Sequence, residues 1–115
     1  RKYIWHRDHR ITGTVTLDAI YPYARDRLCY PEQIAEGLEP HRVKEVYLWG
    51  AEEADTYIDI SDTFDTKMAA LICHASQLGQ YREVIGQRIK ARAEKTGEGE
   101  GVPLAEAFRR IEIIF

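Results

Sequence analysis

Two histidines flank an aspartate close to the start of this 115-residue chain, in the stretch His6-Arg7-Asp8-His9-Arg10. A neutral imidazole binds zinc and similar metals, and a carboxylate can orient a neighbouring imidazole and raise its basicity. The two histidines are three residues apart, so their rings can approach one point if a helix begins between them. These residue types at this spacing indicate a metal site or an acid–base site.

The same stretch has a simpler interpretation, and as a metal site it is incomplete. A solvated, charged helix N-terminus would have a similar sequence, with Asp8 interacting favourably with the helix dipole. Catalytic zinc usually takes three protein ligands and keeps one open position, and a site made only of His6, Asp8 and His9 would be cramped. Among the other histidines, His74 beside an apolar helix face is interpreted as a partly buried structural residue. His41 is interpreted as an exposed loop residue that could line a pocket rim.

The composition excludes several classes of partner. The 115 residues are enough for one small domain or for part of a larger one. A net charge of −3, from 16 basic and 19 acidic residues mixed along the chain, predicts no general attraction to nucleic acid or to membranes. No segment approaches the ~18 consecutive apolar residues of a membrane-spanning helix, so we expect no membrane span. Cys29 and Cys73 are isolated, and each is predicted to be a buried free thiol rather than half of a disulfide, which favours the cytoplasm.

The elements that would hold these residues are predicted from the spacing of apolar side chains. A helix is predicted over residues 8–28, kinked or shortened near Pro22 because proline has no backbone donor. The helical face from Phe64 to Leu78 is the most regular and is predicted to be core, and the next helix should turn Tyr81 and Val84 inward. The remaining elements are a strand end or connector over 1–5, a loop with one helical turn over 29–42, strands over 43–49 and 56–60, helices over 61–79 and 80–95, a flexible loop over 96–103, and a last strand over 107–115.

This order of elements predicts an α/β layer architecture. A sheet of only these short strands would be thin for the amphipathic helices that must pack on it. Either some helices pack on each other, or further strands come from elsewhere.

Five short blocks of residues, spread over nearly all of the chain, occur in a recognisable order. They are His6-Arg7-Asp8-His9-Arg10; Glu39-Pro40-His41-Arg42-Val43 with Val46-Tyr47-Leu48; Asp59-Ile60-Ser61; Lys67 with Ala70-Leu71, His74 and Ser76-Gln77; and Ala105-Glu106-Ala107-Phe108. In this order they resemble the C-terminal half of the LmbE-like (PIG-L) N-deacetylases. Enzymes of that family are zinc-dependent hydrolases of N-acetylated sugars and related amides.

The resemblance implies a fold and a larger context for the chain. The family has a Rossmann-like α/β sheet with flanking helices, so residues 1–115 would be the C-terminal portion of a single deacetylase domain, with only that part of the fold present. In the family, an upstream Ala-His-Pro-Asp-Asp-Glu motif supplies two zinc ligands and the general base. This motif is absent from the sequence. The remaining zinc ligands and strands are therefore expected from a preceding segment, or from a homo-oligomer partner.

The resemblance also implies a role for individual residues of the first block. His9 takes the position of the third zinc ligand. His6 takes that of the group that stabilises the oxyanion of the tetrahedral intermediate, with Asp8 supporting it. The family usually has proline where this chain has Arg7, a departure that can alter the local turn but removes no reacting group.

The function implied by the resemblance is zinc-dependent hydrolysis of an N-acetyl group on a sugar or glycoconjugate, as part of a longer enzyme. The 115 residues alone are then expected to be inactive. One alternative is a catalytically inactive α/β binding or interaction module derived from the same family. A further alternative is an unrelated hydrolase that uses His6 and Asp8 as a proton relay, for which the sequence offers no identifiable nucleophile.

Overall fold

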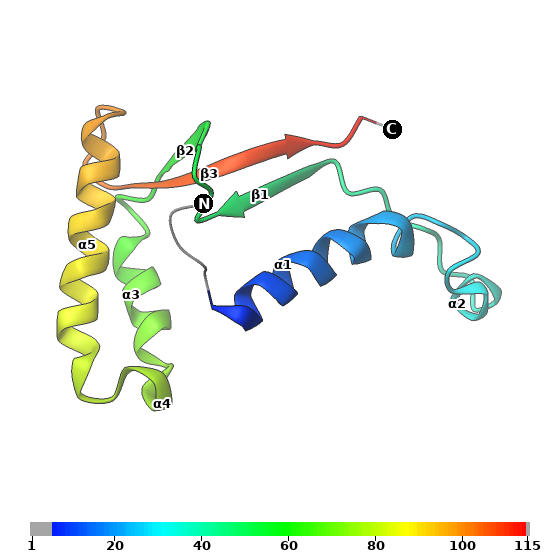
Figure 1. The fold of residues 1–115 in the computed structure, drawn as a ribbon, viewed down its shortest axis with the longest axis horizontal. Coiled ribbons are helices and arrows are strands. Elements are labelled where there is room, and N and C mark those ends of the chain that lie inside the picture. The colour runs from blue at the N-terminus through cyan, green and yellow to red at the C-terminus, as the bar shows by residue number, and fades with distance from the viewer. Residues whose placement is uncertain (1–5, 115) are drawn as a thin grey trace. The chain divides into compact units, whose positions relative to one another are not determined.

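The computed structural model describes residues 6–114 and consists of two compact units (Figure 1). One unit contains residues up to 44 and those from 113 onward, and the other contains residues 45–112. The predicted connector over residues 1–5 lies outside the described residues. The assignment of residues 1–115 to a single domain stays a prediction. Among residues 6–114, no helix is both long enough and apolar enough to cross a lipid bilayer.

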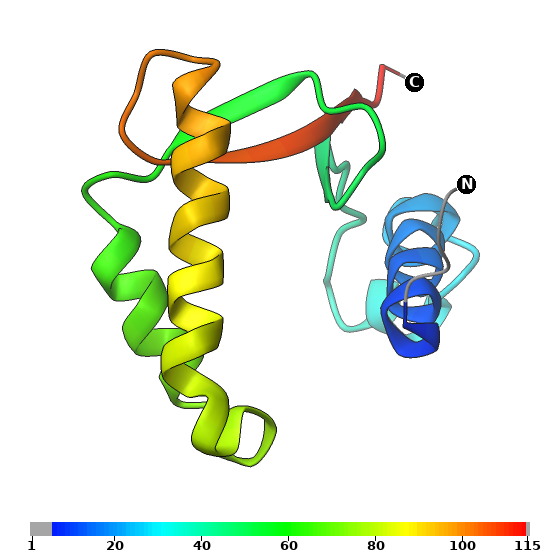
Figure 2. The same ribbon diagram turned by 60° about the vertical axis from the view of Figure 1, so that its left-hand side comes forward.

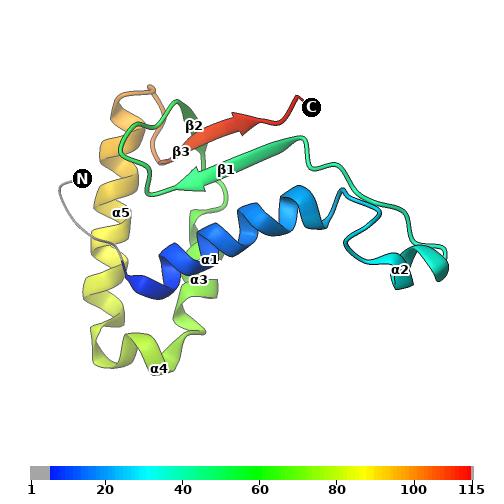
Figure 3. The same ribbon diagram turned by 45° about the vertical axis from the view of Figure 1, so that its right-hand side comes forward.

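The first unit is built on helix α1 (Arg7–Asp18). The π-helical segment η1 (Ala19–Tyr23) and the short helix α2 (Pro31–Ala35) follow it. Figure 3 shows α1 and α2 as separate helices joined by an irregular segment. Within η1, Tyr21 is extended (φ −150°, ψ 125°) and is followed by Pro22, which cannot donate to the helix. The predicted shortening of the helix near Pro22 is therefore confirmed, and a continuous helix to residue 28 is wrong. The predicted helical turn before residue 36 is confirmed by α2.

The described part of the first unit has no buried side chain. The apolar positions of α1 are open to solvent, with Ile11 53% and Val15 58% exposed. The same holds beyond α1, where Tyr23 is 48% and Leu38 55% exposed. This unit therefore has helices but no hydrophobic core of its own within the described residues.

The second unit contains a three-stranded antiparallel sheet with helices packed on it. Its strands are β1 (Glu45–Trp49), β2 (Thr56–Asp59) and β3 (Ala105–Glu112), in the order β1-β3-β2. Val46 faces Ile111 across one ladder, and Ile58 faces Glu106 across the other. The mixture of helices and strands is confirmed. Because this sheet is antiparallel, the parallel sheet of a Rossmann-like fold is not contained in residues 45–112, and that part of the fold class stays a prediction.

The helices of the second unit are α3 (Phe64–Ile72), α4 (Ala75–Leu78), the short 3₁₀ turn η2 (Gly79–Tyr81) and α5 (Arg82–Glu98). Figure 2 shows α5 running beside α3. Ile60, Phe64 and Ala93 form the core, and Met68, Ile89 and Leu104 pack against it. Their burial provides the main stabilisation of this unit.

The predicted helix over 61–79 is wrong as a single element. It breaks at His74, whose backbone (φ −80°, ψ 53°) is not helical, and only α4 follows. Of the face predicted to be core, Phe64 and Leu78 are buried, whereas Ile72 is 47% exposed. Tyr81 and Val84 were predicted to face inward, but they are 61% and 46% exposed. The 3₁₀ turn that contains Tyr81 changes the helical phase, and no apolar periodicity reveals such a turn.

The predicted flexible loop begins too early, because α5 continues to Glu98. Its last turn is stabilised by the close approach of the following segment: the carbonyl of Gly97 accepts hydrogen bonds from the N–H groups of Glu100 and Val102. A Cβ at Gly97 would lie 2.3 Å from the Val102 carbonyl oxygen. The last strand likewise begins earlier than predicted, at Ala105, because the Leu104 carbonyl accepts from Ile60 N–H and starts the pairing of β3 with β2.

Candidate functional site

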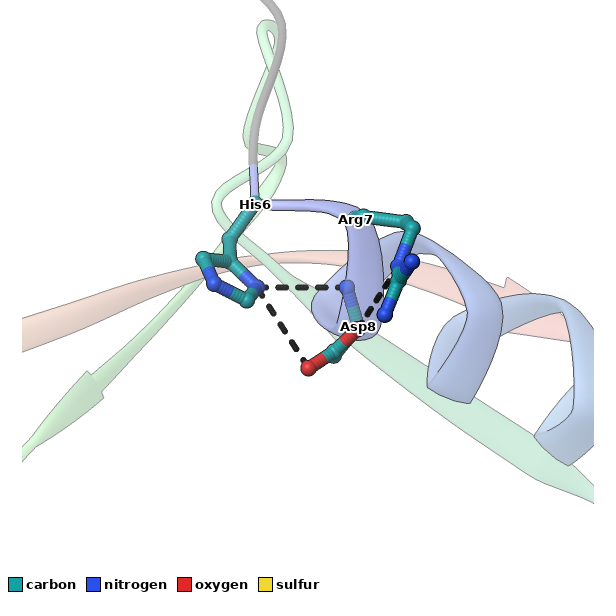
Figure 4. A network of polar contacts seen from close by, with 3 residues as sticks. All are labelled: His6, Arg7 and Asp8. Atoms are coloured by element: carbon teal, nitrogen blue, oxygen red, sulfur yellow. Dashed lines mark hydrogen bonds and ion pairs between the residues drawn. The ribbon is translucent and has the colours of Figure 1, made fainter.

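The two histidines of the first block lie at the N-terminus of α1. His6 precedes the helix with a non-helical backbone (φ −50°, ψ 135°) and caps it. Its Nδ1 accepts a hydrogen bond from the Asp8 backbone N–H at 3.2 Å, and its carbonyl accepts from Arg10 N–H, also at 3.2 Å (Figure 4). These bonds satisfy backbone donors that would otherwise have no partner in the first turn. The imidazole is therefore held in place by the helix it begins.

The spacing brings the two imidazoles together as predicted. The ring centroids of His6 and His9 lie 5.4 Å apart at an interplanar angle of 50°. Both side chains are exposed. Two neighbouring exposed imidazoles have the chemistry to bind a metal ion or to transfer a proton.

Asp8 lies in the first turn of α1, and its carboxylate faces both Arg7 and His6. Its Oδ1 accepts a hydrogen bond from Arg7 Nε at 3.1 Å, whereas its Oδ2 lies 4.0 Å from His6 Nδ1. Figure 4 shows the carboxylate between the two side chains. The distance to His6 is short enough for electrostatic attraction but too long for a hydrogen bond. Sequence reasoning missed the contact with Arg7, although adjacent opposite charges were the available signal.

The hydrogen bond to Nδ1 determines which tautomer of His6 is present. A nitrogen that accepts an N–H bond has no proton of its own, so in the neutral ring the proton is on Nε2. His6 can therefore donate a hydrogen bond to a ligand from Nε2. Asp8 supports this arrangement through its backbone N–H rather than through its carboxylate.

The described residues do not form a complete metal site. Among residues 6–114, no group of three or more His, Cys, Asp or Glu side chains is arranged to hold a metal ion together. His9 offers an exposed imidazole, which is a suitable donor for zinc. The donor type fits zinc, but the number of donors does not reach the usual set of three protein ligands.

The other histidines and the cysteines are found in varied surroundings. His41 is exposed, as predicted, and it also lines a cavity of about 360 Å³ in the first unit, together with Tyr23 and Tyr30. His74 is exposed rather than partly buried, because the helix breaks at this residue. Both cysteines are free thiols, as predicted, but their predicted burial is wrong: Cys73, which directly follows α3, is exposed, and Cys29 is only partly buried.

The third block, Asp59-Ile60-Ser61, builds a turn in the second unit. The Asp59 carboxylate accepts hydrogen bonds from the Ser61 hydroxyl at 2.6 Å and from the Ser61 N–H at 2.9 Å. These bonds, the hydroxyl first, lower the pKa of Asp59. The Ser61 hydroxyl oxygen also accepts from Leu104 N–H at 3.3 Å. This block therefore joins β2 to the start of β3 rather than forming a reactive site.

The fourth and fifth blocks meet in an ion pair. Lys67 on α3 pairs with Glu106 on β3 through its ammonium group, and both side chains are partly buried. This contact links α3 to the sheet. Of the five blocks, the first thus lies at the start of α1 with the two imidazoles, whereas the third, fourth and fifth make structural contacts in the second unit.

A further polar network lies along the sheet and was not predicted. Arg110 donates to Glu45, which also accepts from the Tyr47 hydroxyl at 2.7 Å. The bond from Arg110 lowers the pKa of Glu45, and the bond to Glu45 raises the pKa of Tyr47. Asp55 accepts from Arg110 N–H at 2.8 Å, which lowers the pKa of Asp55. Strand register created these contacts, and no motif in the sequence indicates them.

Comparison with known proteins identifies deacetylases of sugars as similar to this chain. No family model matches it. A diacetylchitobiose deacetylase from Thermococcus kodakarensis is 28% identical over 114 residues, which cover 98% of this chain and 42% of that protein. Such enzymes belong to the LmbE/PIG-L deacetylase superfamily, in agreement with the resemblance found in the sequence.

A solved structure of a deacetylase is also similar to this chain. The N,N'-diacetylchitobiose deacetylase from Pyrococcus horikoshii, in complex with its inhibitor MPG, superimposes with a TM-score of 0.79 at 25% identity. The match covers 96% of this chain and 42% of the other chain, in the C-terminal part of the deacetylase fold. The present chain thus spans less than half the length of both relatives.

Proposed function

We propose that this chain is the C-terminal part of a zinc-dependent deacetylase that hydrolyses the N-acetyl group of an amino sugar or its conjugate. The observation that carries the proposal is the pair of adjacent imidazoles, His6 and His9, at the start of α1. They occur in a chain whose whole course is similar to enzymes named for the deacetylation of diacetylchitobiose. A short acetylated oligosaccharide is therefore the substrate class to test first.

His9 is the residue we assign to zinc, with the other ligands and the general base on polypeptide outside this sequence. The similarity covers only 42% of each relative, which leaves room for such a segment. The uncovered apolar side chains of the first unit support the same idea. Ile11 and Val15, each more than half exposed on α1, would gain stability if further polypeptide covered them.

His6 and Asp8 are assigned to the reaction itself. When bound, zinc lowers the pKa of a coordinated water to about 7 and so provides a nucleophile. His6 donates from Nε2 to the oxygen of the acetamide as negative charge develops on it. Asp8 holds the neutral imidazole by donating its backbone N–H to Nδ1, which keeps the ring proton on Nε2. One such donor typically contributes about 10²–10³ to the rate.

The test is a comparison of two histidine variants in the full-length gene product. Acetate release from N,N'-diacetylchitobiose and bound zinc are measured for wild type, His9→Ala and His74→Ala. We expect His9→Ala to lose both zinc and activity. His74→Ala, which removes another exposed imidazole, should keep both.

Two results would overturn the proposal. Full zinc content and activity in His9→Ala would remove His9 from the metal site. A wild-type protein that binds the disaccharide but releases no acetate would indicate the alternative, an inactive binding module.

A further inference from the structure

We infer that Arg7 is a positioning residue that keeps the ring proton of His6 on Nε2 by holding the Asp8 carboxylate away from Nδ1. The inference concerns a residue that has no reacting atom of its own. It rests on the proposed function only for its effect on catalysis, because the position of the proton can be measured without any activity.

Two contacts compete for the same nitrogen. Nδ1 of His6 either accepts from Asp8 N–H, as it does at 3.2 Å, or carries a proton and donates it to the Asp8 carboxylate, now 4.0 Å away. One nitrogen cannot do both, because accepting needs a lone pair and donating needs a proton. The partner of Nδ1 therefore decides whether the ring proton is on Nε2 or on Nδ1.

Arg7 acts on the side-chain partner in this competition. Its Nε donates to Asp8 Oδ1 at 3.1 Å, which occupies the carboxylate and turns it toward the guanidinium (Figure 4). The backbone N–H of Asp8 is fixed by the helix, so it remains the partner of Nδ1. Without Arg7, the carboxylate would be free to close the gap to Nδ1 and to draw the proton there.

The expected size of the effect on the His6 tautomer follows from the exposure of the Arg7 and Asp8 side chains. The side chains of Arg7 and Asp8 are 77% and 62% exposed, and ion pairs between such side chains are weak. Loss of Arg7 should therefore raise the ratio of the Nδ1–H to the Nε2–H form of His6 by about two- to fivefold. Because only the Nε2–H form donates from Nε2, kcat should fall by up to the same factor, with KM unchanged.

The experiment uses the full-length gene product with ¹⁵N-labelled histidine. Two-bond ¹H–¹⁵N spectra at about pH 8.5, where an ordinary imidazole is neutral, report the tautomer of His6 in wild type, Arg7→Met and Arg7→Lys. We expect Arg7→Met to shift the ratio toward Nδ1–H. Arg7→Lys keeps a cation beside Asp8 and should restore most of the wild-type ratio. Arg88→Met removes the same charge from α5 and should leave the ratio unchanged.

The same Arg7 substitution made in the Asp8→Ala variant isolates the role of the Asp8 carboxylate. In Asp8→Ala there is no carboxylate to approach Nδ1, although the backbone N–H remains, so adding Arg7→Met should change neither the tautomer nor kcat. A tautomer ratio unaffected by Arg7→Met, or a shift that persists in the Asp8→Ala background, would overturn the inference. If the protein released no acetate, the proposed function would fail, whereas the spectra would still decide the role of Arg7.

Discussion

The two units of this chain differ in what their side chains do. The unit of residues 45–112 buries Ile60, Phe64 and Ala93 in a core and fastens its elements with the Lys67–Glu106 pair. The described part of the other unit buries no side chain, yet it carries the two imidazoles that could do chemistry. The difference teaches that blocks behind one resemblance lie in different surroundings: some make contacts that stabilise a core, and one presents two exposed imidazoles. Variants in the two units should therefore fail in different ways.

The largest effect is expected at His6. In the full-length gene product, His6→Ala should lower kcat by about 10²–10³, because a donor to the developing oxyanion is lost, while bound zinc is retained. Steady-state kinetics and metal analysis check this. His6→Asp is the matched control, since aspartate is also a good helix N-cap but donates no hydrogen bond when ionised. An active His6→Asp variant would show that only the cap matters.

Gly97 should be a sensitive position for the stability of the second unit. Gly97→Ala places a methyl group 2.3 Å from the Val102 carbonyl oxygen, so α5 and the following segment must move apart at a cost of about 2–3 kcal/mol. Denaturant unfolding measures the loss. Gly99→Ala is the control, because the nearest atom to its Cβ would be at 3.7 Å. Equal midpoints for the two variants would contradict the close approach.

A smaller effect is expected at the ion pair between α3 and β3. Lys67→Met should lower the free energy of unfolding by about 1 kcal/mol, because Glu106 loses its partner in a partly buried position. Acetate release should be unchanged if the units divide their roles as described. Lys90→Met on the exposed side of α5 controls for the lost charge. A fall in kcat with Lys67→Met would contradict this division.

The smallest expected effect is a loss of folding stability at acidic pH. Hydrogen bonds lower the pKa values of Asp59, Asp55 and Glu45 in the second unit. A lowered pKa in the folded state adds stability above the ordinary carboxylate pKa, and this stability is lost as pH falls through the lowered value. Unfolding followed from neutral to acidic pH should show this decline. It should be weaker in Asp59→Asn, and an identical profile for this variant would exclude a contribution from Asp59.

Local patterns predicted several elements in both units. The two short strands after residue 43 were expected where β1 and β2 occur, and the helical turn before residue 36 was expected where α2 occurs. β-branched and aromatic runs bounded by glycine or proline carry this information within a few residues. The break at His74 and the extension of α5 to Glu98 were not predictable in this way. They depend on backbone contacts with the next few residues, as at Gly97, or on a non-helical backbone at a single residue, as at His74.

By itself, the sequence determined which residues could do chemistry here and that their spacing brings two imidazoles together, because a helix repeats every few residues and sets its own side-chain neighbours. It also determined the order of helices and strands. Only the tertiary structure decided that Asp8 contacts Arg7 through its carboxylate and His6 through its backbone. It also decided that β3 lies between β1 and β2 and that the first unit, over its described residues, buries no side chain. Such features depend on which of several available partners a group meets in space, and spacing along the chain does not specify that choice.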